Sequence, residues 1–351
     1  MKHFVTTLLM SCLALLAIGQ GFTGSTKHET VLFADQQSAI QYNKGIAFYA
    51  TSQPDSAIAC FTKALEYDAQ QTDALYNRAV LYFETKNYAK ALEDLQLLNN
   101  GKQNPAVSVL LGKTHLKLGD KALAMQSFNS AIKTDPSNAS IYYYRGNLQY
   151  QNKAYEKALE DFSTAVKLNP QLAIAYNDRG IVYRTLEQYE KALEDFKKAT
   201  LLDAQLDFAF DNLGDIRMKM NRFKEAETDF TAALKINPDN YIAFNNRGLA
   251  RLKLGEYVYA LEDFNTALSI NPNFTEAKGN KGYTLFLQED YDASLQLFTE
   301  ILQKDPNNGK ILFNRGIVKE MLRDELGACD DWQKALDLGI QESQQYLKNC
   351  K

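Results

Sequence analysis

The sequence predicts an all-α solenoid built from nine helix hairpins and closed by a C-terminal capping helix. Three observations support this prediction. A 34-residue period runs through the chain, each period holds two stretches with apolar residues at helical spacing, and small residues recur at fixed places in both stretches. The segments "NDRGIVYRTLEQYEKALEDF" at 177–196 and "NNRGLARLKLGEYVYALEDF" at 245–264 show the repetition directly.

The N-terminal residues precede the repeats and have the layout of a secretory signal peptide. Lys2 and His3 are followed by an apolar run from Phe4 to Ile18 and then by Gly19, after which cleavage is expected. We predict a signal peptide at 1–19 and a loosely ordered lead-in at 20–37. An uncleaved anchor is the alternative, although the run is short for a spanning helix of roughly 20 residues. The expected location is the bacterial periplasm or cell envelope, with no membrane span after cleavage.

A column of small residues sets the repeat boundaries. Glycine recurs every 34 residues from Gly112 to Gly316, and Ala79 and Gly45 continue the column toward the N-terminus. Counting this residue as position eight gives nine repeats: 38–71, 72–104, 105–138, 139–172, 173–206, 207–240, 241–274, 275–308 and 309–342. Residues 343–351 are predicted to form a capping helix that covers the last hydrophobic face.

Each repeat is predicted to be two helices joined by a short polar turn. Position 20 is small in every repeat, and position 24 is large and apolar. The small residues let two helix backbones approach closely, and the large residue fills the space beside them. Gly119 and Gly255 lie at the turn, where a helix C-terminus favours glycine. Prolines that stop the second helix occur in five repeats, at Pro136, Pro170, Pro238, Pro272 and Pro306.

These columns resemble those of the tetratricopeptide repeat (TPR) family, and the resemblance covers residues 38–342. It implies a right-handed superhelix whose first helices line the concave face. It also implies a protein that binds other proteins or peptides. Chaperone-binding members hold a terminal carboxylate with cationic groove residues, but position five carries no lysine in this chain.

Arginine and aspartate recur together, which predicts ion pairs within repeats. Position seven is arginine in repeats two, four, five, seven and nine, and position 23 is aspartate in the same repeats. Repeat six is mixed, with Leu213 and Asp229. A planar guanidinium suits a partly buried carboxylate, whereas the alternative is a row of ligand-binding arginines. The expected pairs are Arg78–Asp94, Arg145–Asp161, Arg179–Asp195, Arg247–Asp263 and Arg315–Asp331.

Positions two, five, six, nine, twelve and thirteen of the first helix are expected to face the concave groove. Position six is mostly asparagine, and a row of amides can bind the backbone of an extended peptide. The alternative is that these amides bond to a neighbouring helix. Tyrosines toward the N-terminal end and aspartates in the middle would add specificity, the aspartates for a basic segment. The predicted partner-binding residues are Asn43, Asn77, Asp178, Asn212, Asn246, Asn280, Asn314, Tyr143, Tyr144, Asp211 and Asp215.

Composition and motifs argue against catalysis and against nucleic-acid binding. The net charge is −4, whereas nucleic-acid surfaces are normally basic. The sequence shows no nucleophile–base pair, phosphate loop or metal-ligand spacing, and His115 is the one histidine within the repeats. We therefore predict no catalytic residue, no metal and no cofactor, and a non-catalytic interaction scaffold. Self-assembly through the array ends and a regulatory subunit of an envelope complex are the alternatives, and the sequence sets no oligomeric state.

The cysteines suggest one disulfide. Cys12 leaves with the signal peptide, so Cys60, Cys329 and Cys350 remain, an odd number for an exported protein. Cys329 lies in the second helix of repeat nine, and Cys350 lies in the predicted capping helix nearby. These two residues are candidates for a disulfide.

Overall fold

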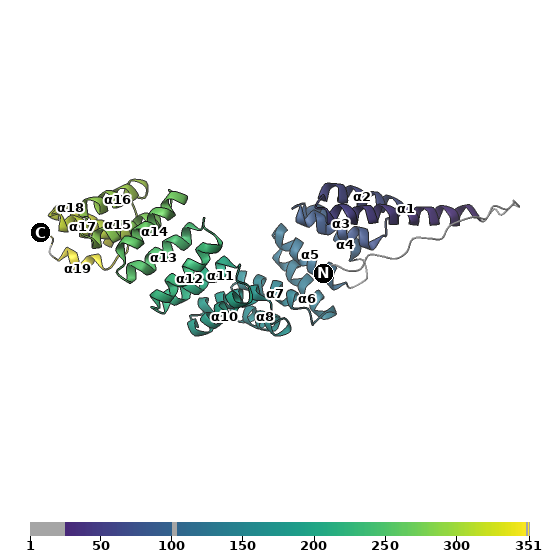
Figure 1. Ribbon diagram of the computed structural model, residues 1–351, viewed down its shortest axis with the longest axis horizontal. Helices are drawn as coiled ribbons and strands as arrows, with labels where there is room; N and C mark the ends of the chain where they lie inside the picture. The colour runs from purple at the N-terminus through teal and green to yellow at the C-terminus, as the bar shows by residue number, and fades with distance from the viewer. Residues whose placement is uncertain (1–24, 100–103, 349, 351) are drawn as a thin grey trace. The chain divides into compact units, whose positions relative to one another are not determined.

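The computed structural model describes residues 25–99, 104–348 and 350, which form nineteen α-helices. The chain divides into two bodies, Met1–Ser127 and Phe128–Lys351. Within each body the helices follow one another in chain order as hairpins (Figure 1). This arrangement is the all-α hairpin array that the 34-residue period predicts.

The helix bounds follow the predicted repeats closely. The N-terminal body holds α1 (Ser25–Ala50), α2 (Pro54–Tyr67), α3 (Thr72–Glu84), α4 (Tyr88–Leu98), α5 (Pro105–Leu118) and the start of α6 (Lys121–Thr134). The C-terminal body holds the rest of α6, then α7 (Ala139–Gln151), α8 (Tyr155–Leu168), α9 (Ala173–Thr185), α10 (Tyr189–Leu202), α11 (Asp207–Lys219), α12 (Phe223–Ile236), α13 (Tyr241–Lys253), α14 (Tyr257–Ile270), α15 (Thr275–Leu287), α16 (Tyr291–Lys304), α17 (Gly309–Met321), α18 (Glu325–Asp337) and α19 (Ser343–Leu347).

Two boundary predictions are corrected by the structure. The lead-in is not loose from Ser25 onward, because α1 runs for 26 residues from there. No glycine or proline interrupts the chain between Ser25 and Lys44, so nothing stops the helix. The capping helix is five residues long and ends at Leu347, not at the terminus. The predicted signal peptide lies outside the described residues.

Glycine at position eight is required by the ring at position 24. A Cβ atom built on Gly248 would lie 2.7 Å from Cε1 of Phe264, closer than real side chains approach. Equivalent rings lie against the glycines of other repeats, and these phenylalanines are fully buried. Repeat two has Ala79 with Leu95 in place of the ring, because a smaller partner leaves room for a methyl group.

Every hairpin turn contains one residue in the left-handed region, at position 15. It is glycine in Gly119 and Gly255 and a larger residue elsewhere, such as Glu187 with φ 57°. The next residue closes the turn, since Gln188 N–H donates to Tyr183 C=O at 2.9 Å. This six-to-one bond is the Schellman closure of a helix C-terminus. The turn geometry is thus constant although glycine marks it in two repeats.

The predicted disulfide is present. Cys329 of α18 and Cys350 are bonded, with their Cα atoms 5.9 Å apart. Cys60 is a free thiol. No helix in the described part of the chain is both long enough and apolar enough to cross a membrane.

Candidate protein-binding site

The first helices of the C-terminal body form one inner row. Each contacts the first helix of the next repeat, from α7 with α9 through to α15 with α17, while each second helix packs between first helices.

A pocket of about 320 Å³ lies on this row. Three successive first helices supply its walls, and every lining residue falls at position six, nine, twelve or thirteen of its repeat. The lining residues are Arg184 of α9, Asp215, Met218 and Lys219 of α11, and Asn246 and Leu249 of α13. The sequence-based groove positions therefore include those that line a cavity large enough for a side chain.

The pocket combines an apolar wall with fixed charge. Arg184 Nη1 donates to Asn212 Oδ1 at 3.0 Å and lies 3.5 Å from Asp215 Oδ2. Met218 and Leu249 supply the apolar part of the lining. Because these contacts use the Nη1 atom of Arg184, the Nε and Nη2 donors stay available to a partner.

The asparagines at position six bond to the preceding repeat. Asn212 Nδ2 donates to Asn177 Oδ1 at 3.0 Å, and Asn280 Nδ2 donates to Asn245 Oδ1 at 2.8 Å. In both cases the acceptor is at position five of the preceding repeat, and Asn177 and Asn245 are buried. The sequence left open whether these amides bind a peptide or a neighbouring helix, and the structure shows the helix contact.

Among the other members of the column, Asn77 has its acceptor at position five of the preceding repeat and Asn246 has its acceptor at position nine. In the N-terminal body, Asn77 Nδ2 donates to Tyr42 Oη at 3.1 Å. Asn246 Nδ2 donates to Asp215 Oδ1 at 3.1 Å. Asn314 follows a repeat with Gly279 at position five, which offers no side-chain acceptor, and Asn43 stands in the first repeat. The partner-binding role of this column stays a prediction.

Two aspartates in the middle of the row, Asp178 and Asp211, are bonded to neutral donors. Asp211 Oδ2 accepts from Asn240 Nδ2 at 2.6 Å, while Asp211 Oδ1 is buried with no hydrogen-bond donor. Burial raises the pKa of Asp211 to about 7. Asp178 accepts from Tyr143 Oη at 3.0 Å and from Asn177. Their capacity to attract a basic segment is therefore partly used or reduced at neutral pH.

The two predicted anchor tyrosines are engaged in packing. Tyr143 is half-buried, and burial raises its pKa. The Tyr144 ring lies 5.4 Å from the Tyr143 ring and 6.1 Å from the Phe128 ring. These contacts place both tyrosines in the packing of the C-terminal body.

All five expected ion pairs are present within their own repeats. In each pair the Nη2 atom of arginine lies 2.7 Å from the Oδ1 atom of aspartate. Arg179 is representative, since its Nε donates to Asp195 Oδ2 at 2.8 Å as well. The aspartates are buried and the arginines are largely covered. These residues therefore tie the two helices of a hairpin together, as the structural interpretation predicts.

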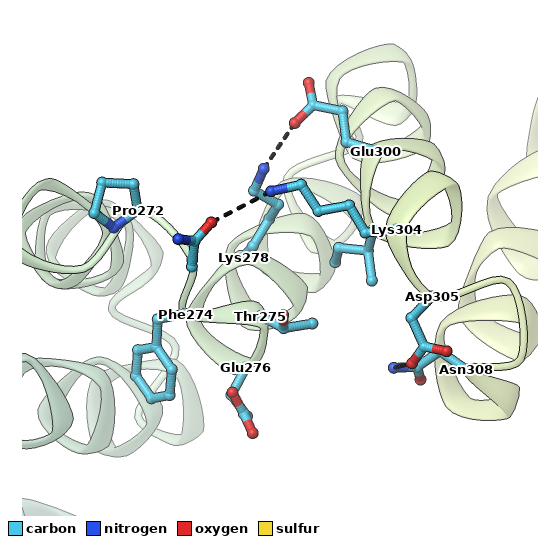
Figure 2. Close-up of a pocket in the computed structure, with 11 residues that line it drawn as sticks. Pro272, Phe274, Thr275, Glu276, Lys278, Glu300, Lys304, Asp305 and Asn308 are labelled. Carbon is cyan, nitrogen blue, oxygen red and sulfur yellow. Dashed lines mark hydrogen bonds and ion pairs between the residues drawn. The ribbon is translucent and has the colours of Figure 1, made fainter.

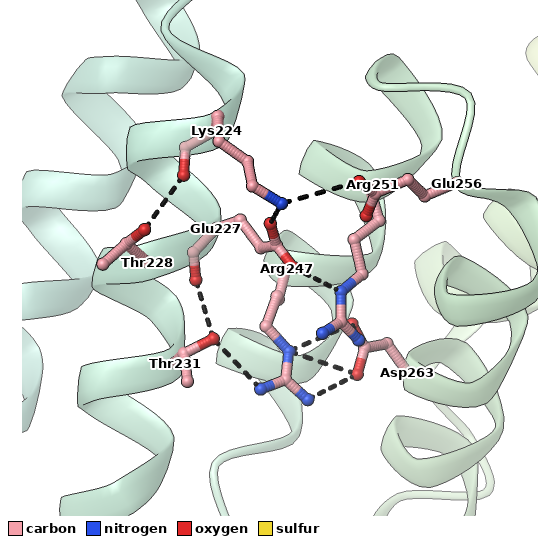
Figure 3. A network of polar contacts seen from close by, with 8 residues as sticks. All are labelled: Lys224, Glu227, Thr228, Thr231, Arg247, Arg251, Glu256 and Asp263. Atoms are coloured by element: carbon pink, nitrogen blue, oxygen red, sulfur yellow. Dashed lines mark hydrogen bonds and ion pairs between the residues drawn. The ribbon is translucent and has the colours of Figure 1, made fainter.

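A second cation, at position eleven, was missed by the sequence reasoning. In repeat six, Arg217 replaces the missing position-seven arginine and lies 2.6 Å from Asp229 Oδ2. In repeat seven, Arg251 Nη1 joins Arg247 on Asp263, at 2.9 Å from Oδ2 (Figure 3). An arginine at position eleven, one helical turn after position seven, is the sequence signal that could have predicted a partner for Asp229 in repeat six.

The arginines also reach the preceding repeat. Arg247 Nη1 donates to Thr231 Oγ1 at 3.3 Å, and Arg251 Nε donates to Glu227 at 3.0 Å (Figure 3). Position 25 of the preceding repeat supplies the polar acceptor in all five cases: Thr62, Asn129, Ser163, Thr231 and Thr299. The ion pairs thus join neighbouring repeats as well as the helices of one hairpin.

A separate pocket of about 350 Å³ lies where the loop before α15 faces the end of α16 (Figure 2). Lys278 Nζ donates to Glu300 at 2.9 Å, and Lys304 Nζ donates to Asn273 at 3.4 Å across its mouth. Lys278 and Glu300 are therefore paired with each other, whereas Lys304 is bonded to a neutral amide. Among the described residues, no group of three or more histidine, cysteine, aspartate or glutamate side chains is placed to hold a metal ion.

Comparison with family models identifies the repeats. A tetratricopeptide repeat model matches residues 42–105, 109–173 and 260–309, and two further models of such repeats match 173–205, 241–274 and 214–255. The chain belongs to the tetratricopeptide repeat family. Members of this family are typically non-catalytic and bind proteins or peptides, which agrees with the predicted non-catalytic interaction scaffold.

Each match to a similar protein covers only part of that protein's length. "Heat shock protein STI1" of Saccharomyces cerevisiae is 35% identical over 99 residues, which are 27% of this chain and 16% of the relative. The "Small glutamine-rich tetratricopeptide repeat-containing protein" of Dictyostelium discoideum is 31% identical over 105 residues, 27% of this chain and 29% of the relative. The chain therefore spans less than a third of these relatives.

One solved structure supports the fold over a longer stretch. The C-terminal part of a TPR repeat-containing protein from Cytophaga hutchinsonii superposes with a TM-score of 0.55 at 17% identity. The match covers 68% of this chain and 98% of that structure.

Proposed function

We propose that this TPR protein is a scaffold of the bacterial cell envelope that binds a protein or extended peptide along its inner row. The observation that carries the proposal is the pocket formed by α9, α11 and α13. It is the place on the row where an apolar wall, an anchored guanidinium and a second cation meet.

The pocket fits a side chain with an apolar stem and an acidic end. Arg184 and Lys219 outnumber Asp215 in the lining, so the local balance favours a negative group. Asp215 already accepts from Asn246. Met218 and Leu249 would contact the stem, and burial of the stem would contribute about 0.8 kcal/mol per methylene.

Two observations support location in the envelope. The first is the signal-like N-terminus with its apolar run from Phe4 to Ile18. The second is the disulfide between Cys329 and Cys350, because disulfides persist in oxidising compartments. Fractionation of expressing cells, followed by N-terminal sequencing, tests this part. A chain that begins at Gln20 in the periplasmic fraction supports export, whereas an intact N-terminus in the cytosol rejects it.

Site-specific photocrosslinking tests the binding site. A photoreactive phenylalanine at Leu249 should capture a partner peptide, while the same probe at Leu201, which is 78% exposed on the second helix α10, should not. Equal capture at both positions, or capture at Leu201 alone, would move the binding surface away from the inner row.

Charge reversal tests the chemistry of the pocket. Lys219→Glu should weaken binding of the captured peptide, because it adds a negative charge beside Asp215. Lys253→Glu is the matched control, since Lys253 has the same position in the next repeat and lies outside the pocket. Equal affinity for the two variants would reject an acidic partner side chain.

A further inference from the structure

Two columns of the first helix are buried in every repeat except the first. In repeats two to nine, positions three and ten are all buried: Ala74, Val107, Ile141, Ala175, Ala209, Ala243, Ala277 and Ile311, and Leu81, Thr114, Leu148, Val182, Ile216, Ala250, Thr284 and Val318. In repeat one the same positions are Ile40, which is 45% exposed, and Ala47, which is also exposed. Phe33, one heptad before Ile40, is 59% exposed. We call these three residues the α1 end face.

The residues that cover these columns elsewhere come from the preceding repeat. Val182 of α9 packs with Ala158 and Phe162 of α8, and Ala250 of α13 packs with Phe230 of α12. The covering residues are those at positions 20, 24 and 27 of a second helix. The α1 end face therefore has the form of a socket for a second helix of the TPR type.

The other end of the chain carries the matching second helix. In α18, positions 20, 24 and 27 are Ala328, Trp332 and Ala335, and all three are buried. The Trp332 ring contacts the Tyr346 ring of α19, which begins at Ser343, 34 residues after the start of α17 at Gly309. The helix α19 thus occupies the place of the first turn of a tenth repeat.

Two contacts hold α19 on this surface. The Tyr346 ring lies 4.8 Å from the Trp332 ring and 5.3 Å from the Phe313 ring. The Cys329–Cys350 disulfide ties the end of the segment to α18. A helix of five residues has little stability of its own, so the covalent tie is the main restraint on its position.

We propose that α19 is a disulfide-locked plug that prevents head-to-tail assembly of this protein. When the disulfide is reduced, α19 leaves α18, and the α1 end face of a second copy docks on Ala328, Trp332 and Ala335. The new junction reproduces the junction between successive repeats of one chain. Reduction takes two electrons and two protons from a thiol reductant, which becomes a disulfide, and leaves Cys329 and Cys350 as thiols.

Light scattering coupled to size exclusion, over a range of protein concentrations, tests the plug. A Cys60→Ser background removes the free thiol, so that intermolecular disulfides do not form. The oxidised protein should have the mass of a single chain at every concentration. A variant that also carries Cys329→Ser and Cys350→Ser, and a second one that lacks residues 343–351 and carries Cys329→Ser, should give masses that rise with concentration in steps of one chain.

The α1 end face is tested in the same plug-free background. Ile40→Asp should abolish the rise in mass, because it places a carboxylate in the junction. Ile242→Asp is the matched control, since Ile242 is 48% exposed and lies away from both ends, and it should leave the rise unchanged. Helical circular dichroism establishes that each variant is folded. A folded plug-free variant that keeps the mass of one chain, or assembly that survives Ile40→Asp, would overturn the proposal.

Discussion

Asp263 should contribute more to local stability than Asp195, because it neutralises two guanidiniums. Asp195 pairs with Arg179, whereas Asp263 pairs with both Arg247 and Arg251. The perturbation is Asp→Asn at each site, which removes the charge and keeps the size of the side chain. The two aspartates have the same position in their repeats, so the packing around them is closely matched.

The magnitude follows from burial and from the number of partners. Asp263 is 2% exposed, and the side chains of Arg247 and Arg251 are 15% and 17% exposed. Removal of one partner from a buried ion pair costs about 3–5 kcal/mol. Two guanidiniums lose Asp263 as a partner and Glu227 still faces one of them, which places Asp263→Asn at about 4–5 kcal/mol. For Asp195→Asn, one guanidinium loses its partner, which gives about 3 kcal/mol.

Hydrogen exchange with mass spectrometry is the suitable assay. Long repeat arrays depart from two-state unfolding, so a single unfolding free energy is poorly defined. Exchange of amides in α14 and α10 reports local opening free energies for the two sites separately. Equal losses at the two sites, or a larger loss for Asp195→Asn, would refute the reasoning from two guanidiniums. Losses below about 1 kcal/mol at both sites would show that the pairs behave as exposed ion pairs do.

Three further predictions concern the core and the inner row. Gly248→Ala should destabilise the protein by about 1–3 kcal/mol in hydrogen exchange of α13, and adding Phe264→Leu should restore part of the loss. Failure of the second change to help would disprove the explanation of the glycine column. Burial raises the pKa of Asp211 to about 7, so the folded state keeps a proton that the unfolded state loses above about pH 4, and stability should fall as pH rises toward 7. Asp211→Asn should therefore raise the urea midpoint at about pH 8 and change it little near pH 4, and the reverse order would contradict the assignment. Alanine at both Asn212 and Asn246 should lower the thermal midpoint, since each lost hydrogen bond costs about 0.5–1.5 kcal/mol. An unchanged midpoint would mean that these amides do not stabilise the fold and would favour a role in partner binding alone.

The sequence alone determined the repeat architecture and its ion pairs. The nine copies show which positions keep one kind of residue from repeat to repeat. Positions eight, 20 and 24 do so, and these columns predict the helix hairpin. The co-occurrence of Arg179 with Asp195, and of its counterparts, predicted which carboxylate each guanidinium meets, because both residues belong to one hairpin and depend on one local geometry. The Cys329–Cys350 disulfide was predicted on a different ground, because a capping segment that covers the last repeat brings Cys350 back near Cys329.

The tertiary structure decided what happens between repeats. Whether Asn212 faces a peptide or Asn177 depends on the rotation of one repeat on the next, which no pattern within a single repeat contains. The pocket at Arg184 and Leu249 likewise needs three first helices in place at once. The same holds for exposure at the ends. Ile40 matches a buried column in sequence and is exposed because no second helix in the described part of the chain packs on that side of α1, whereas Trp332 is buried because Tyr346 and the disulfide bring α19 back onto it. Local periodicity determines a helix hairpin, but burial depends on which neighbour is present, and that is a property of the assembled chain.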